Sequence, residues 1–171
     1  MDTLISRGWA LVDMATAVMQ DKGEFAMQYI VVAPDGSADV FQPPPQTANS
    51  PLLKDAMLKT LQELGRVQQP AAVLVVADAW FSQASVSVDP AELNTMRFIP
   101  LAELRRRGMV GESREVILCS IQTPIECTLL RQYYRREDGK IVLEERETVN
   151  GKEAFKGRIF RFFDGQQEAH A

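Results

Sequence analysis

Residues 114 to 149 read REVILCSIQTPIECTLLRQYYRREDGKIVLEERETV, and this stretch decides the fold. It contains three runs rich in β-branched, aromatic and other apolar residues, which favour strands. Thr-Pro and Asp-Gly pairs separate the runs and favour turns. A fourth run, GRIFRFF at 157–163, follows an Asn-Gly pair at 150–151. We therefore predict a meander of antiparallel strands in the last third of the chain.

The Asp-Gly pair at 138–139 predicts a two-residue hairpin, because both residues tolerate the positive φ that such turns require. This turn fixes the register of the two flanking strands. Glu137 is then expected opposite Lys140, and Tyr133 opposite Glu144.

Two amphipathic helices are predicted before the meander. Apolar residues at a spacing of three to four predict the first helix from Thr3 to Lys22, with Gly23 placed to end it. The second helix has Ser50 as its N-cap, Pro51 at its first position and Gly65 just beyond its end. The remaining elements are expected to be strands at 25–32, at 38–41 and through the apolar run that begins VLVV at 73, and a helical turn or two within 100–107.

These elements predict an α+β fold, with a mostly antiparallel sheet of six or seven strands covered by two main helices. The continuous apolar run at 73–76 indicates a strand buried on both faces, in the middle of the sheet. A chain of 171 residues has the length of one domain. We expect a single domain over 1–165 and a flexible C-terminal tail over 166–171.

Composition narrows the classes of function. The chain has 19 basic and 23 acidic residues, and a net charge of -4 gives no field that attracts a polyanion, so nucleic acid is not expected as a partner. The sequence shows no signal-peptide pattern and no apolar run long enough to span a membrane. Two cysteines in 171 residues fit a reducing compartment. We expect a cytoplasmic protein with no cofactor and no membrane partner, and the sequence leaves a small-molecule ligand unknown.

Histidine and cysteine usage excludes several kinds of site. The single histidine, His170, is the penultimate residue, where chains usually fray, so histidine-dependent triads and multi-histidine metal sites are not expected. Cys119 and Cys127 cannot supply the four ligands of a structural zinc site. We predict that both cysteines face one apolar side of their hairpin as buried small hydrophobic residues, and do not form a redox pair.

Asp78 and Trp80 form the first candidate site, because side chains two apart on a strand share a face. In one interpretation, Asp78 ends a central strand as a desolvated carboxyl group with a raised pKa and acid or base competence. In the other, Asp78 accepts hydrogen bonds from a following turn while Trp80 fills the edge of the core. We favour the second, because buried polar groups are normally satisfied by structural partners.

Glu112, Arg114 and Glu115 form the second candidate site. In an extended segment Glu112 and Arg114 face one way and Glu115 faces the other. Arg114 could bind Asp78 through two parallel hydrogen bonds, which would make it a structural pin. The candidate catalytic residues are therefore Asp78, Arg114 and Glu115, the candidate ligand-binding residues are Trp80 and Arg114, and no dedicated metal ligand is predicted.

Two weaker patterns are explained structurally. Pro34-Asp35 and Asp138-Gly139-Lys140 contain the letters of a metal-dependent nuclease motif, but both pieces fall in predicted hairpin turns, where Asp and Gly serve the backbone. KGRIFRFF at 156–163 partly matches the aromatic octamer of RNA-recognition motifs, yet Arg158 stands where that motif carries a base-stacking aromatic residue. We expect Phe160 and Phe162 to be core residues of an edge strand.

The basic run RQYYRRE at 131–137 faces the acidic run LEERE at 143–147 in the predicted hairpin. Opposite charges on neighbouring strands compensate each other and contribute a few tenths of a kcal/mol per pair. We predict a solvated face held by cross-strand pairs among Arg131, Arg135, Arg136, Glu144, Glu145 and Glu147.

VVADAW at 75–80, followed by ESREVIL at 112–118 and a hairpin strand that ends in an acidic stretch, resembles a loosely defined group of uncharacterised bacterial and archaeal proteins. In that group a strand ends in an acidic residue, Ala and Trp, and a later strand opens with Arg and Glu. The resemblance covers roughly residues 73–147 and implies no activity. If the pattern marks a site, it carries over to Asp78, which is more often Glu in the group, and to Trp80, Arg114 and Glu115.

The function expected from these observations is a non-enzymatic binding or self-assembly module that forms a homo-oligomer, because an antiparallel sheet with two covering helices leaves edges and faces for association. The alternative is a metal-dependent, hydrolase-like enzyme that uses Asp78 with Glu112 or Glu115. A weak RNA-binding function through the C-terminal strand is the third possibility.

Overall fold

The computed structural model describes residues 1–44, 47, 50–84, 99, 101–151 and 162–163. The expected tail at 166–171, which contains His170, lies outside these residues, and so does Phe160. Among the described residues, no helix is long and apolar enough to cross a membrane.

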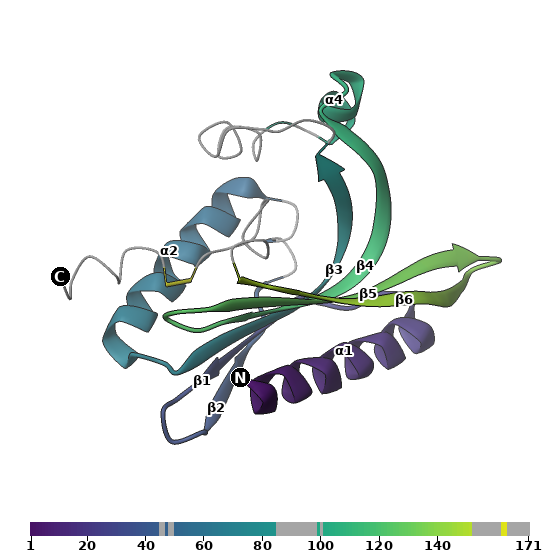
Figure 1. Ribbon diagram of the computed structural model, residues 1–171. Coiled ribbons are helices and arrows are strands. Elements are labelled where there is room, and N and C mark those ends of the chain that lie inside the picture. The colour runs from purple at the N-terminus through teal and green to yellow at the C-terminus, as the bar shows by residue number, and fades with distance from the viewer. Residues whose placement is uncertain (45–46, 48–49, 85–98, 100, 152–161, 164–171) are drawn as a thin grey trace.

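The described strands form one six-stranded antiparallel sheet, as the meander predicts, in the order β2-β1-β3-β4-β5-β6 (Figure 1). Each strand pairs with its neighbour along the chain except where α2 separates the β1–β2 hairpin from β3. The strand bounds are β1 Gln28–Val32, β2 Ala38–Phe41, β3 Ala72–Ala84, β4 Val110–Gln122, β5 Cys127–Glu137 and β6 Lys140–Asn150.

Helix α1 (Asp2–Lys22) covers one side of the sheet, which we call the α1 face. Its buried residues Val12, Ala15 and Met19 pack against a cluster from the central strands that includes Leu74 and Ile121. The helix ends at Gly23, whose φ of 79° lies in the left-handed region that favours glycine, as the sequence predicts.

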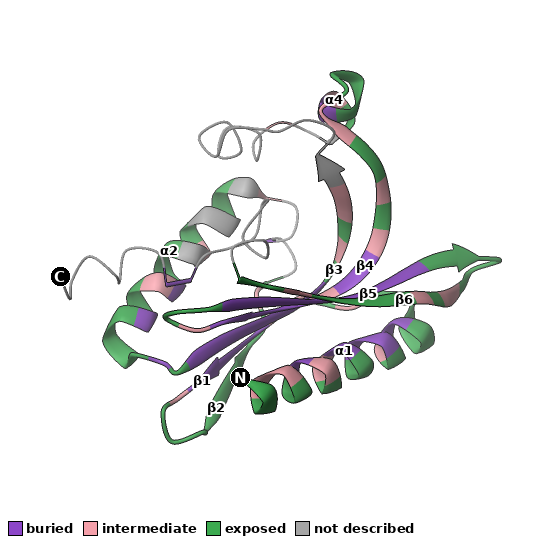
Figure 2. Cartoon of the chain, viewed as in Figure 1, coloured by how far each residue is buried: buried purple, intermediate pink, exposed green. Residues whose placement is uncertain are grey.

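Helix α2 (Pro51–Gln68) covers the opposite side, the α2 face (Figure 1). Its N-terminus is as predicted, because the Ser50 hydroxyl accepts a hydrogen bond from the Leu53 backbone N–H at 3.3 Å. Leu61 packs there in a second cluster with residues of β1 and β3, Tyr29, Val31, Val73 and Val75, and with Phe162 and Phe163. The apolar run at 73–76 is therefore buried on both faces, as predicted, and Figure 2 shows this buried centre.

The predicted end of α2 at Gly65 is wrong. The helix continues to Gln68, and Gln69 takes the left-handed conformation that closes it. Gly65 is buried, and a β-carbon there would lie 2.4 Å from the Phe162 ring. The glycine therefore allows close packing within the helix and does not terminate it.

The hairpin register is partly as predicted. Glu137 lies opposite Lys140, and the Asp138-Gly139 turn has positive φ at both residues. A bulge between Gln132 and Tyr134 removes the predicted pairing of Tyr133 with Glu144. An extra residue in one strand shifts the register beyond it by one, which turn chemistry does not reveal.

The two cysteines are buried, as predicted, but they lie on opposite faces of the sheet. Cys119 is opposite Leu130 on the α1 face, whereas Cys127 is opposite Gln122. The four-residue connection between the strands exchanges odd and even positions, so sequence parity misleads across it. Burial raises the pKa of the Cys119 thiol to about 12, which makes it unreactive.

The other short elements need two corrections. Helix α4 (Leu101–Arg106) is present as expected, but β3 extends to Ala84, so Asp78 lies inside the strand and does not end it. Phe162 and Phe163 are buried in a turn, not in an edge strand of the sheet.

Candidate functional site

The sheet divides into two ribbons beyond Glu115 and Tyr134. These residues form the last described pair between β4 and β5. Among the described strands, β4 runs from there back to Val110 beside β3 alone, and β5 runs on to Glu137 beside β6 alone. Figure 1 shows the β3–β4 ribbon curving away toward α4 while the β5–β6 ribbon keeps its direction. We call the region where the ribbons part the fork.

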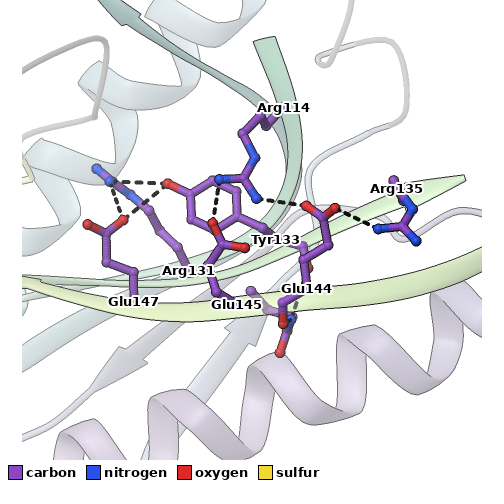
Figure 3. Close-up of polar contacts among 8 residues, drawn as sticks. Arg114, Arg131, Tyr133, Arg135, Glu144, Glu145 and Glu147 are labelled. Carbon is purple, nitrogen blue, oxygen red and sulfur yellow. Dashed lines mark hydrogen bonds and ion pairs between the residues drawn. The ribbon is translucent and has the colours of Figure 1, made fainter. Parts of the chain in front are cut away.

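Ion pairs on the α2 face tie the two ribbons together at the base of the fork. Arg114 of β4 donates hydrogen bonds to Glu144, at 2.7 Å, and to Glu145 of β6, and Arg135 donates to Glu144 at 3.1 Å (Figure 3). The bonds from Arg114 lower the pKa of Glu145 to about 2 and lower that of Glu144. These contacts therefore stabilise the fork fully at pH values above 4.5, the ordinary pKa of a glutamate carboxyl group. The stabilisation is lost as the pH falls towards 2.

Arginine and aromatic side chains stack behind these ion pairs. The Arg114 guanidinium lies 4.0 Å from the ring centroid of Tyr133, and that of Arg131 lies 4.1 Å from the ring centroid of Phe81. The two rings meet edge to face at 6.1 Å. Arg131 is buried and binds Glu147 at 2.9 Å, and the Tyr133 hydroxyl donates to the same carboxylate. All these polar groups have partners, so the stack holds the ribbons in place.

The predicted compensation of the basic and acidic runs is confirmed for Arg131 and Arg135, which bind Glu147 and Glu144. Arg136 differs, because it lies on the α1 face and binds Glu115 of β4 at 3.0 Å. It also donates to the Gly23 carbonyl oxygen at the end of α1.

Asp78 belongs to a small polar cluster on the α1 face. The buried Tyr134 hydroxyl donates a hydrogen bond to Asp78 Oδ1 at 2.6 Å, and Glu115 Oε1 lies 3.4 Å from the same hydroxyl. Partial burial raises the pKa of Asp78 above 3.8, and the Tyr134 hydrogen bond and the charge of Arg136 offset part of that rise. Asp78 therefore has a structural hydrogen-bond partner, as the interpretation that we favour predicts. The partner, however, is Tyr134 of strand β5 and not a turn that follows Asp78.

We expect Asp78→Asn to raise the melting temperature at pH 7 by roughly 1–2 °C, a small value because solvent still screens this carboxyl group. A carboxyl group whose pKa is higher in the folded state opposes folding when it is ionised. Asparagine removes that charge and keeps an oxygen that accepts from Tyr134. The gain should shrink as the pH falls towards 3.8, because Asp78 of the wild type then takes up its proton. Thermal unfolding between pH 3.5 and 8 measures the difference.

Asp35→Asn is the matched control, because the pKa of Asp35 is lowered by hydrogen bonds from Ser37. Its effect on stability at pH 7 should have the opposite sign and should also fade in acid. A lower melting temperature for Asp78→Asn at neutral pH would show that the ionised carboxylate stabilises the fold.

The structure separates the candidate residues. The predicted pairing of Arg114 with Asp78 is wrong, because Asp78 lies on the α1 face opposite Ile117 and Arg114 lies on the α2 face opposite Phe81. Trp80 shares the face of Asp78, as predicted, but it is 63% exposed and does not fill the core edge.

Asp78 and Glu115 do meet on one face, whereas Glu112 lies on the other, so the structure divides the carboxylates of the hydrolase interpretation. Within the described part of the chain, no group of three His, Cys, Asp or Glu side chains could hold a metal ion. Pro34 and Asp35 lie in the turn between β1 and β2, and Asp138 and Gly139 in the turn before β6, as the structural explanation predicts.

An open cavity of about 540 Å³ lies along the outer part of β4. Its lining includes four consecutive strand residues, 110–113, together with Trp80 of β3 and Arg105 of α4. The register between β3 and β4 shifts between Ser82 and Ala84, so β4 carries a bulge between Val110 and Ser113, and the cavity follows this bulged part of the strand. Sequence reasoning identified Trp80 and missed Arg105, Val110, Gly111 and Ser113, because nothing in their spacing indicates that β5 leaves β4 at this point.

No family model, curated protein or solved structure matches the chain.

Proposed function

We propose that the chain is a non-enzymatic binding module that captures an extended segment of another protein at the fork. The observation that carries this proposal is the outer part of β4, Val110–Arg114, which pairs with β3 on one side and with no described strand on the other. A strand edge of this kind presents backbone N–H and C=O groups that can bind an added strand.

The cavity supports the same ligand. It runs along 110–113, the part of β4 that has no second neighbour among the described strands, and Gly111 adds no side chain there. Trp80 lines it with a largely exposed indole. Aromatic residues of this kind frequently dominate the energy of a protein interface.

The charges indicate which peptides fit best. Arg106 and Arg107 of the same segment bind Glu103, whereas Arg105, which lines the cavity, makes no ion pair with a described residue. A carboxylate on the ligand would satisfy Arg105. We therefore expect an extended peptide that combines an apolar or aromatic side chain, packed on Trp80, with a nearby Asp or Glu.

Arg114 takes a positioning role in this proposal. It binds Glu144 and Glu145 on the α2 face and so keeps the β3–β4 ribbon at a fixed distance from β6. The ligand would then meet a preformed edge, which lowers the cost of ordering on binding.

Selection from a phage-displayed library of random dodecapeptides tests the proposal. We expect enriched peptides with an apolar residue close to an acidic one, and Trp80→Ala should weaken their binding at least about tenfold in a fluorescence polarisation titration. Val40→Ala, which also truncates an exposed apolar residue on a strand, should leave the affinity unchanged. Equal binding to wild type and Trp80→Ala, or no enrichment over empty beads, would contradict the proposal.

Backbone N-methylation of the selected peptide tests strand addition directly. Only every second residue of a strand donates its N–H to a given neighbour. Methylation at alternate positions should therefore abolish binding, and methylation at the intervening positions should be tolerated. Uniform tolerance would show that the peptide binds through its side chains alone.

A further inference from the structure

A second surface, far from the fork in the sequence, lies on helix α2. Its described side chains include an apolar stripe, which we call the α2 stripe, made of Leu53, Ala56, Thr60, Leu64 and Val67. At 3.6 residues per turn these five positions fall within about 80° of the helix circumference. All five are exposed, with Leu53 at 44%, Leu64 at 38% and Val67 at 77%.

The stripe adjoins the face that α2 buries in its own fold, because Met57 of that face lies within about 20° of Leu64 around the helix. Among the side chains of α2 that the structure describes, Leu61 and Gly65 are buried, and Met57 packs beside them against β1 and β3. The apolar surface of α2 is therefore wider than the part that its own fold buries, and the exposed remainder indicates a second contact.

The order of residues along the stripe is self-complementary about Thr60. Leu53 and Val67 each lie seven residues from Thr60, and Ala56 and Leu64 each lie four residues from it. In an antiparallel pair of such helices related by a twofold axis at Thr60, Leu53 meets Val67 of the second copy and Leu64 covers the small Ala56. An isologous interface requires such symmetry within one sequence, whereas a foreign helix does not.

The charges beside the stripe follow the same symmetry. Lys59 and Glu63 are exposed and flank it on one side. In the antiparallel arrangement, Lys59 of one copy and Glu63 of the other lie on the same side of the helix pair. Along the helix axis they are about two residues, or about 3 Å, apart. The flanking charges therefore attract each other across the pair.

We infer that the α2 stripe is the surface through which two copies of this chain associate, with Thr60 on the twofold axis. This inference is independent of the proposed function, because the fork is formed by strands β3 to β6 and includes no residue of the α2 stripe.

Light scattering on a gel-filtration column tests the association. At tens of micromolar the wild type should show twice the chain mass of 19.1 kDa, and Leu64→Asp should show the monomer mass with unchanged far-UV circular dichroism. Asp39→Asn, a substitution at an exposed position outside the stripe, should leave the dimer intact. A wild type that elutes as a monomer at 100 μM would overturn the inference.

Cross-linking tests the position of the axis. Thr60→Cys should form a disulfide-linked dimer within minutes of mild oxidation, because the two residues face each other, whereas Arg66→Cys, on the charged side of the same helix, should remain a monomer on non-reducing gels. The native cysteines are buried and do not compete. A dimer that survives Leu64→Asp, or that cross-links equally through both engineered cysteines, would place the interface elsewhere and overturn the inference.

Discussion

Replacing Leu130 by alanine should lower the free energy of unfolding by roughly 2–5 kcal/mol, the range observed when a large buried side chain is truncated. Leu130 is 0% exposed in the centre of β5, within the cluster that joins the sheet to α1. The helix approaches closely there, because Gly8 of α1 lies directly over Leu130 and Ile121. Neither the helix backbone nor the paired strands can move in to fill the space, so the cavity should persist.

Urea unfolding followed by circular dichroism measures the loss at Leu130. The slope of the free energy of unfolding against urea concentration should be the same for the variant and the wild type. The shift of the midpoint then reports the change in stability alone. Val40→Ala, on the exposed edge strand β2, is the control and should change the stability by less than about 0.5 kcal/mol. A loss below about 1 kcal/mol for Leu130→Ala would mean that α1 does not pack on this part of the sheet.

The parts of the fold that local chemistry specifies could be predicted from the sequence. Ser50 and Pro51 fix the start of α2, Gly23 fixes the end of α1, and Asp138-Gly139 fixes the tip of the last hairpin. In each case a few neighbouring residues determine the backbone conformation. The antiparallel order of the sheet then follows, because consecutive strands joined by short turns pair with each other.

The features that the sequence did not reveal depend on contacts between distant segments. Gly65 looks like a helix terminator because its role is to accommodate Phe162, which is 97 positions later in the chain. The bulge at Tyr133 brings Glu144 and Glu145 together around Arg114, and no turn signal precedes it. The packing of both strands determines where a bulge forms, so its position cannot be predicted from the sequence of either strand alone.

The candidate site shows the same division. The alternation of residues correctly put Asp78 and Trp80 on one face, and Arg114 on the opposite face from Glu115. Alternation does not show how neighbouring strands are aligned, so it cannot identify Tyr134, rather than Arg114, as the partner of Asp78. The fork exists because β3–β4 and β5–β6 each extend beyond the region that they share, which depends on the lengths of four strands at once.

The contact between α2 and the C-terminal aromatic residues gives the second large effect. Phe162 is buried beside Gly65, and its backbone N–H donates a 2.7 Å hydrogen bond to the side chain of Gln122. Phe162→Ala should lower the free energy of unfolding by roughly 3–5 kcal/mol, as for other buried aromatic residues. Gly65→Ala should lower it by about 1–3 kcal/mol, because the new methyl group would lie 2.4 Å from the ring.

The two substitutions together distinguish steric conflict from helix propensity. Alanine is the better helix former by about 1 kcal/mol, so Gly65→Ala should stabilise the protein once Phe162→Ala has removed the ring. Urea unfolding of the wild type, both single variants and the double variant gives this reversal of sign. At the exposed neighbour Arg66, the difference between its Ala and Gly variants calibrates the propensity on the same helix. If Gly65→Ala stabilised the protein with Phe162 present, the ring could not lie against the helix, and the close approach that makes glycine necessary within α2 would not exist.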